Sequence, residues 1–165
     1  LWNNLFFNSR INIFNRRKNE KYILYAPEPI STFNLQKKYG FDELSGLIHL
    51  NKSLEELNSE NIKIIIKPHP NQNETIFINF LKKSNNNKIL FVNDININTL
   101  IYYSECVVGY FSNSLIEAKI FDKKILRLLI ELKEKNIDPL QNKNIGKKIY
   151  SELELSNELK EIMYN

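Results

Sequence analysis

The chain has 165 residues, of which 42% are hydrophobic and 25% charged, and its formal net charge is +4. These values predict one folded domain with a sizeable core and exclude a disordered chain. No apolar run reaches the length of a membrane span, and the first residues lack the order of a signal peptide. The single cysteine, Cys106, excludes an internal disulfide and favours a reducing compartment. We therefore expect a soluble, cytoplasmic domain, and Leu1 in place of an initiator methionine suggests a fragment.

Short β-favouring runs alternate with helical patterns along most of the chain. The expected strands are residues 21–26, 62–66, 89–92, 106–109 and 124–130. Apolar residues recur at helical spacing between them, in segments 44–57, 76–81, 96–103 and 115–121. This alternation predicts an α/β fold in which a Rossmann-like parallel sheet carries helices on both faces, with right-handed crossovers.

The two ends of the chain lie outside this pattern. Residues 1–20 mix aromatic and aliphatic side chains with arginines, a basic amphipathic composition that could touch the inner face of a membrane or lie between domains. An ordinary packing helix or strand is the favoured interpretation of this segment. Residues 131–150 form a connection rich in Lys and Asn, and residues 153–163 predict a closing helix. We therefore expect an N-terminal segment at 1–20 and a Rossmann-like domain at 21–165.

The most informative motif is Lys67-Pro68-His69-Pro70, directly after the apolar run 62–66. Two prolines hold the backbone extended, so a stiff loop presents His69 at the carboxyl end of a strand, where open α/β sheets bind ligands. The positive charge of Lys67 suits an anionic group such as phosphate. His69 could donate a hydrogen bond or a proton to a leaving phosphate. The alternative is a structural histidine that bonds to local carbonyls.

A second motif lies where residues 106–109 turn into the next helix. Ser114 and Glu117 have capping-box spacing, which predicts a helix that starts just after Ser114 with free backbone N–H groups at its end. Those groups, together with the hydroxyls of Ser112 and Ser114, could hold a phosphate without a glycine-rich loop. The alternative is a plain helix cap. Both motifs follow parallel strands, so we expect them at one edge of the sheet, within reach of one ligand.

His-Pro after an apolar strand, then a strand, a Ser-x-Ser turn and a helix with Glu-Ala, resembles the C-terminal nucleotide-binding half of bacterial GT-B sialyltransferases. The lipooligosaccharide sialyltransferase and polysialyltransferase families carry such HP and serine motifs, and related capsule and teichoic-acid transferases have similar segments. The resemblance covers about residues 21–130. It implies one half of a GT-B glycosyltransferase that binds a nucleotide-sugar donor, with a missing N-terminal domain that supplies acceptor contacts and the general base.

The resemblance also implies roles for individual residues. His69 would be catalytic, contacting the CMP phosphate, and Glu117 would reach the ribose or act only in the helix cap. The other donor-binding residues would be Lys67, Pro70, Ser112, Asn113 and Ser114. Glu28, Ser31 and Asp94 would border the cleft, or serve only as turn and cap residues. Asp42-Glu43 faintly echoes the acidic motif of the family but is expected to start a helix.

The resulting hypothesis is the transfer of sialic acid from CMP-sialic acid to a cell-surface glycan acceptor, as in lipooligosaccharide or capsule biosynthesis. No cofactor or metal is expected, and His49 is assigned to a helix surface or boundary. A CDP-glycerol-type glycerophosphotransferase of envelope polymers would use the same His and Ser residues. A non-catalytic module that binds nucleotides or anions is the third alternative. Nucleic acid is not an expected partner, because no basic stripe is interleaved with aromatic residues.

Overall fold

The computed structural model describes residues 19–84, 86–134 and 137–165. The basic segment expected at residues 1–20 lies almost entirely outside the described residues, so its expected contacts stay predictions. The strands are β1 (Lys21–Tyr25), β2 (Ile62–Ile66), β3 (Ile89–Phe91), β4 (Cys106–Gly109), β5 (Lys124–Leu128) and β6 (Lys147–Ile149). The helices are α2 (Gln36–Tyr39), α3 (Glu43–Leu57), α4 (Thr75–Ser84), α5 (Ile97–Tyr103), α6 (Asn113–Ile120) and α7 (Glu152–Tyr164).

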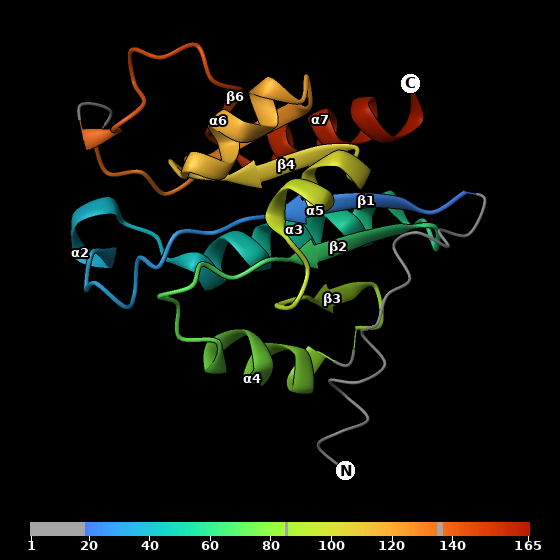
Figure 1. Ribbon diagram of the computed structural model, residues 1–165, viewed down its shortest axis with the longest axis horizontal. Helices are drawn as coiled ribbons and strands as arrows, with labels where there is room; N and C mark the ends of the chain where they lie inside the picture. Colours follow the sequence, from blue (N-terminus) through green and yellow to red (C-terminus); the bar gives the residue numbers. More distant parts are fainter. Residues whose placement is uncertain (1–18, 85, 135–136) are drawn as a thin grey trace.

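All six strands pair in parallel in one sheet with the order β3-β2-β1-β4-β5-β6 (Figure 1). β1 lies at the centre, where Ile23 is opposite Ile64 of β2 on one side and Cys106 of β4 on the other. The order runs one way from β1 to β3 and the other way from β4 to β6. The crevice between β1 and β4 is therefore the topological switch point, where sheets of this kind bind ligands at the carboxyl ends of the strands.

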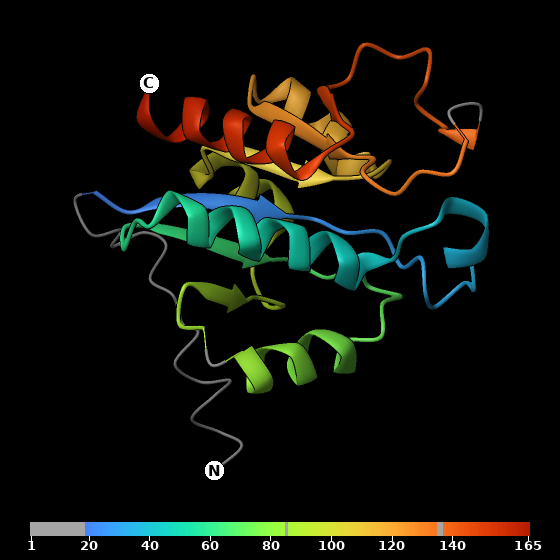
Figure 2. The same ribbon diagram turned by 180° about the vertical axis from the view of Figure 1, so that it is seen from behind.

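The side chains of each strand alternate between two apolar layers, as the two-residue period of a strand requires. Ile23 and Tyr25 of β1 pack in the layer covered by α3, α4 and α7, whereas Tyr22 and Leu24 pack in the layer covered by α5 and α6. Helices α3 and α7 lie over the near face of the sheet in Figure 2, and α5 and α6 lie behind it. The prediction of a Rossmann-like parallel sheet with helices on both faces is confirmed.

The predicted element bounds hold with a few differences. The strand expected at 124–130 ends at Leu128, and the strand expected at 89–92 ends at Phe91. Two short elements lie in segments for which no element was predicted: α2, and β6 within the connection 131–150. Helix α2 has only four residues, and two of the three residues of β6 are lysines, so neither carries an apolar pattern from which it could be predicted.

Helix α3 begins where the sequence predicted, at Asp42-Glu43. The Asp42 side chain accepts hydrogen bonds from the backbone N–H groups of Leu44 at 3.0 Å and Ser45 at 2.8 Å, and the Ser45 hydroxyl accepts from the Asp42 N–H. This reciprocal pair is a capping box. Asp42 therefore fixes the start of the helix that runs under the centre of the sheet.

Gly46, in the first turns of α3, leaves no room for a side chain above two buried phenols. A Cβ atom there would lie 2.2 Å from the Tyr110 hydroxyl and 2.4 Å from the Tyr25 hydroxyl. Gly→Ala in a helix normally adds up to about 1 kcal/mol of stability. Overpacking costs typically about 1–3 kcal/mol, and here the contact is with two buried, hydrogen-bonded groups. We expect Gly46→Ala to be destabilising overall, as measured by urea unfolding.

The same substitution in a Tyr25→Phe/Tyr110→Phe background is the control. Removing both hydroxyls removes the two closest contacts and leaves only the one with Cζ of residue 110 at 3.0 Å, so Gly46→Ala should cost less there than in the wild type. Equal costs in the two backgrounds would contradict this account.

Candidate functional site

The two sequence motifs lie at the same edge of the sheet, on either side of β1. The Lys67–Pro70 loop follows β2 and the turn at 110–112 follows β4, and both strands pair with β1. The loop that follows β1 lies between them. The expectation that one edge brings the motifs together is therefore met in the topology, and these three loops make up the candidate site at the switch point.

His69 is exposed at this edge, and a local hydrogen bond determines which ring nitrogen carries the proton of the neutral ring. Its Nδ1 accepts from the backbone N–H of Asn71 at 3.1 Å. An accepting Nδ1 carries no proton, so the neutral ring has its proton on Nε2. That N–H is the donor that an anion at this edge would meet.

Lys67 is tied to a neighbouring loop. Its Nζ donates to the backbone carbonyl of Asn93 at 2.7 Å, which links the loops after β2 and β3. Partial burial lowers the pKa of Lys67, and the carboxylates of Asp94 and Glu74 oppose that shift. Asp94 is exposed, and its negative charge acts on Lys67. Pro70 is also exposed and follows His69 directly in the chain.

Gln72 holds the His69 loop in place, a role that the sequence did not reveal. It is 8% exposed. Its Oε1 accepts from the His69 N–H at 3.1 Å, and its Nε2 donates to the Glu28 carbonyl at 3.3 Å. Gln72 thus joins the loop after β2 to the loop after β1. In the sequence, only the position of Gln72 three residues after His69 could have indicated this role.

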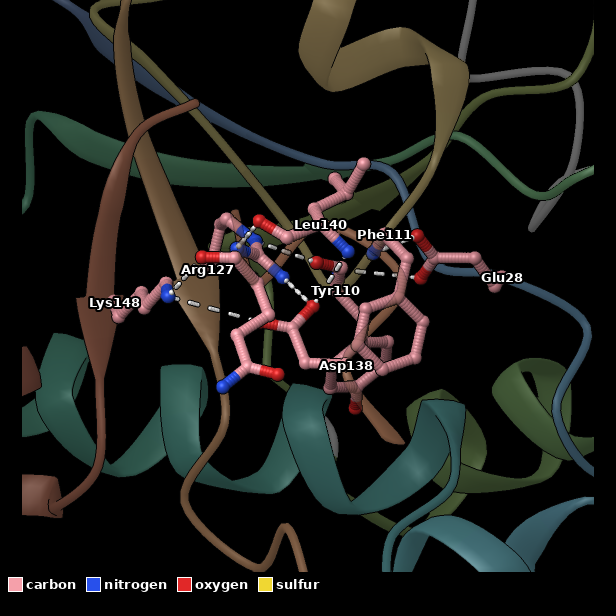
Figure 3. A network of polar contacts seen from close by, with 8 residues as sticks. Glu28, Tyr110, Phe111, Arg127, Asp138, Leu140 and Lys148 are labelled. Atoms are coloured by element: carbon pink, nitrogen blue, oxygen red, sulfur yellow. Dashed lines mark hydrogen bonds and ion pairs between the residues drawn. The ribbon is translucent and has the colours of Figure 1, made fainter. Parts of the chain in front are cut away.

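The Glu28 side chain lies on the turn after β4. Its two carboxylate oxygens accept from the backbone N–H groups of Phe111 at 2.5 Å and Tyr110 at 3.2 Å (Figure 3). Burial, the largest cause, raises the pKa of Glu28 to about 7, against the lowering effect of the backbone N–H groups of Phe111, Tyr110 and Ser112. Glu28 was expected to border the cleft or to serve as a turn and cap residue, and in the structure it binds a turn 82 residues away.

The predicted capping box at Ser114 and Glu117 is wrong. Helix α6 begins at Asn113 with Ser112 as its N-cap, so Ser114 lies inside the first turn. The N–H of Leu115 donates to the Ser112 carbonyl at 3.1 Å, and the helix starts two residues earlier than predicted. The Ser112 hydroxyl is buried and has no hydrogen-bond partner among the residues that the structure describes. Asn113 is exposed, and Ser114 and Glu117 are half-buried.

Ser31 is bound to α3. Its N–H and its hydroxyl both donate to the carboxylate of Glu43, which is 0% exposed. The pair attaches the loop after β1 to the start of α3. Ser31 thus has a structural partner at this edge.

Arg127 supports the turn after β4 from the other side, and the sequence analysis did not single it out. It is fully buried, opposite Gly109 in the sheet. Its Nε donates to the Tyr110 carbonyl at 3.0 Å, Nη1 donates to the Leu140 carbonyl at 3.4 Å, and Nη2 pairs with Asp138 (Figure 3). Its guanidinium also lies 6.0 Å from the centre of the Phe111 ring.

Other candidate features lie away from this edge. His49 pairs with Glu152 at 3.0 Å between α3 and α7, and it is half-buried, in agreement with the predicted boundary position on a helix. A cavity of about 730 Å³ lies at the opposite edge, lined among others by Lys123, Lys124 and Glu161. Within the described ranges, no cluster of His, Cys, Asp and Glu could hold a metal ion. No helix in the part of the chain that the structure describes is long and apolar enough to cross a bilayer.

Comparison with known proteins places these features in a family. The sequence profile of the family described as CDP-Glycerol:Poly(glycerophosphate) glycerophosphotransferase matches residues 8–165. No curated protein sequence matches the chain.

Several solved structures share the fold. A variant of the wall teichoic acid polymerase TagF superposes with a TM-score of 0.64 at 20% identity, over 97% of this chain and 39% of that one. The UDP-GlcNAc 2-epimerase of Methanocaldococcus jannaschii gives 0.62 at 14% identity, over 96% of this chain and 42% of that one. The chain thus spans about two-fifths of the length of these proteins, and the predicted fold of one GT-B half is confirmed.

Proposed function

Because the chain belongs to the CDP-glycerol:poly(glycerophosphate) glycerophosphotransferase family, we propose that it is the donor-binding half of an enzyme that transfers glycerol phosphate from CDP-glycerol to an envelope polymer. The family match over residues 8–165 is the observation that carries the proposal. It favours the CDP-glycerol alternative of the sequence analysis over the transfer of sialic acid. The structural likeness to a wall teichoic acid polymerase supports the fold that such an enzyme needs.

The candidate site suits a nucleotide diphosphate. The Nε2 proton of His69 can bond to a diphosphate oxygen, because Nδ1 is already held by Asn71. The N-terminus of α6, on the other side of β1, offers backbone N–H groups and the Ser112 hydroxyl. Lys67 adds a positive charge at the same edge.

In the proposed reaction an acceptor hydroxyl attacks the phosphorus that carries glycerol. The new P–O bond forms as the bond to the CMP phosphate breaks, and CMP leaves with the electron pair. His69 would stabilise the charge that develops on CMP by a hydrogen bond from Nε2. The general base for the acceptor is assigned to a further domain.

Binding titrations test the proposal. CDP-glycerol, CMP-sialic acid and UDP-GlcNAc are titrated into the purified chain by calorimetry, and we expect CDP-glycerol to bind with the lowest Kd. A hydrogen bond to a charged group is worth about 1.5–3 kcal/mol, so His69→Ala should raise the Kd for CDP-glycerol roughly 10- to 100-fold. His49→Gln, a change in the other histidine of the chain, should leave this Kd unchanged.

Each other outcome has a clear meaning. Preference for CMP-sialic acid would restore the sialyltransferase hypothesis. Binding of CDP-glycerol that His69→Ala does not weaken would favour a module without a catalytic role for His69. No binding of any nucleotide by the folded chain would refute a donor-binding role.

A further inference from the structure

The peptide between Tyr110 and Phe111 is held from two sides. Its carbonyl accepts from Nε of Arg127 at 3.0 Å, and its N–H donates to Glu28 at 2.5 Å. The preceding N–H, of Tyr110, donates to the second oxygen of the same carboxylate at 3.2 Å. Arg127 therefore fixes the orientation in which two successive N–H groups converge on one anion (Figure 3).

The anion in this place is a side chain of the protein itself. The turn lies at the switch point between β1 and β4, beside the buried hydroxyl of Ser112, which has no hydrogen-bond partner within the described part of the chain. Successive backbone N–H groups before a helix bind phosphate oxygens as readily as carboxylate oxygens, since both are charged acceptors of similar geometry. The Glu28 carboxylate thus occupies the donors that a phosphate at this edge would use.

We propose that Glu28 competes with the diphosphate of the donor for the N–H groups of Tyr110 and Phe111. This inference rests on the proposed function. A bound diphosphate takes over these hydrogen bonds and leaves the carboxylate without them beside a second anion. Both changes disfavour the ionised form of Glu28, so donor binding is coupled to the uptake of a proton by this side chain.

The two neighbouring phenols do not take this proton. Burial raises the pKa of Tyr25 and of Tyr110, so both phenols are already neutral. The Glu43 carboxylate accepts its two hydrogen bonds from Ser31 and not from the turn.

Two other groups face the site from neighbouring elements. Arg127 carries its charge on the far side of the Tyr110–Phe111 peptide. His69 is connected to Glu28 through the side chain of Gln72. The contribution of His69 must therefore be measured separately.

The test is the pH dependence of CDP-glycerol binding. This ligand is a diester whose own charge stays constant between pH 6 and pH 8. With Glu28 titrating near pH 7, the wild-type Kd should rise about tenfold from pH 6 to pH 8. In Glu28→Gln the corresponding change should fall below about twofold, and binding at pH 8 should be tighter than in the wild type.

Two further variants separate the effect of Glu28 from that of other side chains at this edge. His69→Gln should bind more weakly at every pH and keep the Glu28-dependent slope. Glu131→Gln removes an exposed carboxylate that follows β5 at the same edge, and it should behave like the wild type. Calorimetry of the wild type in two buffers of different ionisation enthalpy measures the proton directly and requires no variant. We expect nearly one proton taken up per CDP-glycerol at pH 8.

The outcomes separate this inference from the proposed function. Binding of CDP-glycerol without proton uptake, or with the same uptake in Glu28→Gln, would overturn the competition and leave the donor assignment intact. Sulfate, which also keeps its charge in this range, serves as a second probe. If sulfate alone binds, and only Glu28→Gln loses the pH dependence, the donor assignment fails and the competition for an anion stands. If neither ligand binds at pH 6–8, both are refuted.

Discussion

Replacing Arg127 by methionine should lower the free energy of unfolding by about 3–5 kcal/mol. The substitution removes one partner of a buried ion pair and leaves Asp138, whose side chain is 2% exposed, without its main counter-charge. It also removes the donors to the carbonyls of Tyr110 and Leu140. A buried charge that loses its partner costs far more than the intact pair contributes. Urea unfolding at pH 7 measures the loss.

Lys148→Met is the matched control for this result. Nζ of Lys148 lies 3.9 Å from the other oxygen of Asp138, but the side chain is 30% exposed, so its removal should cost less than about 1 kcal/mol. Asp138→Asn in the Arg127→Met background should restore part of the stability, because it removes the orphaned charge. A loss below about 1 kcal/mol for Arg127→Met would show that the pair is not the support of this turn.

The fold was predictable because its signal is local and repeated. Each strand carries its own apolar run, as in Ile62–Ile66, and each covering helix carries its own periodic face. Alternation of the two then restricts the topology to a parallel sheet with right-handed crossovers. The same pattern predicts where β2 and β4 end, so the edge of the sheet that carries His69 and Ser112 could be predicted as well.

The internal contacts of the site could not be predicted, because each joins residues that are far apart in the sequence. Glu28 binds a turn 82 residues away, and the Gln72 amide reaches back 44 residues to the Glu28 carbonyl. Arg127 looked like one charged residue within an apolar strand, since its partner Asp138 lies in a connection without periodic pattern. Such pairs become visible only when the strands are placed side by side.

The capping box at Ser114 shows how a tertiary contact overrides a local signal. Spacing alone favoured Ser114 as the cap, with Glu117 three residues later. In the fold, Glu28 takes the N–H groups of Tyr110 and Phe111, which fixes the chain immediately before α6. The first turn then closes from Ser112, so the helix starts earlier, and the Ser112 hydroxyl is left without a partner among residues 19–84, 86–134 and 137–165.

Glu28 should also make the stability of the protein fall as the pH rises. Burial raises the pKa of this carboxyl from 4.5 to about 7 in the fold. Between these values the folded chain holds a proton that the unfolded chain has released. The stabilisation is therefore fully present below pH 4.5 and is lost as the pH rises through about 7.

Between pH 5 and pH 8 the contribution of this one side chain to the free energy of unfolding should fall by about 2–3 kcal/mol. Glu28→Gln has no titrating group at this position, so the measurement is the difference between wild type and variant in urea unfolding at the two pH values. The variant should be the more stable protein at pH 8 by a margin that shrinks at pH 5. A constant difference would mean that Glu28 does not change its charge in this range. The bonds from Tyr110 and Phe111 would then outweigh the cost of burying the carboxylate.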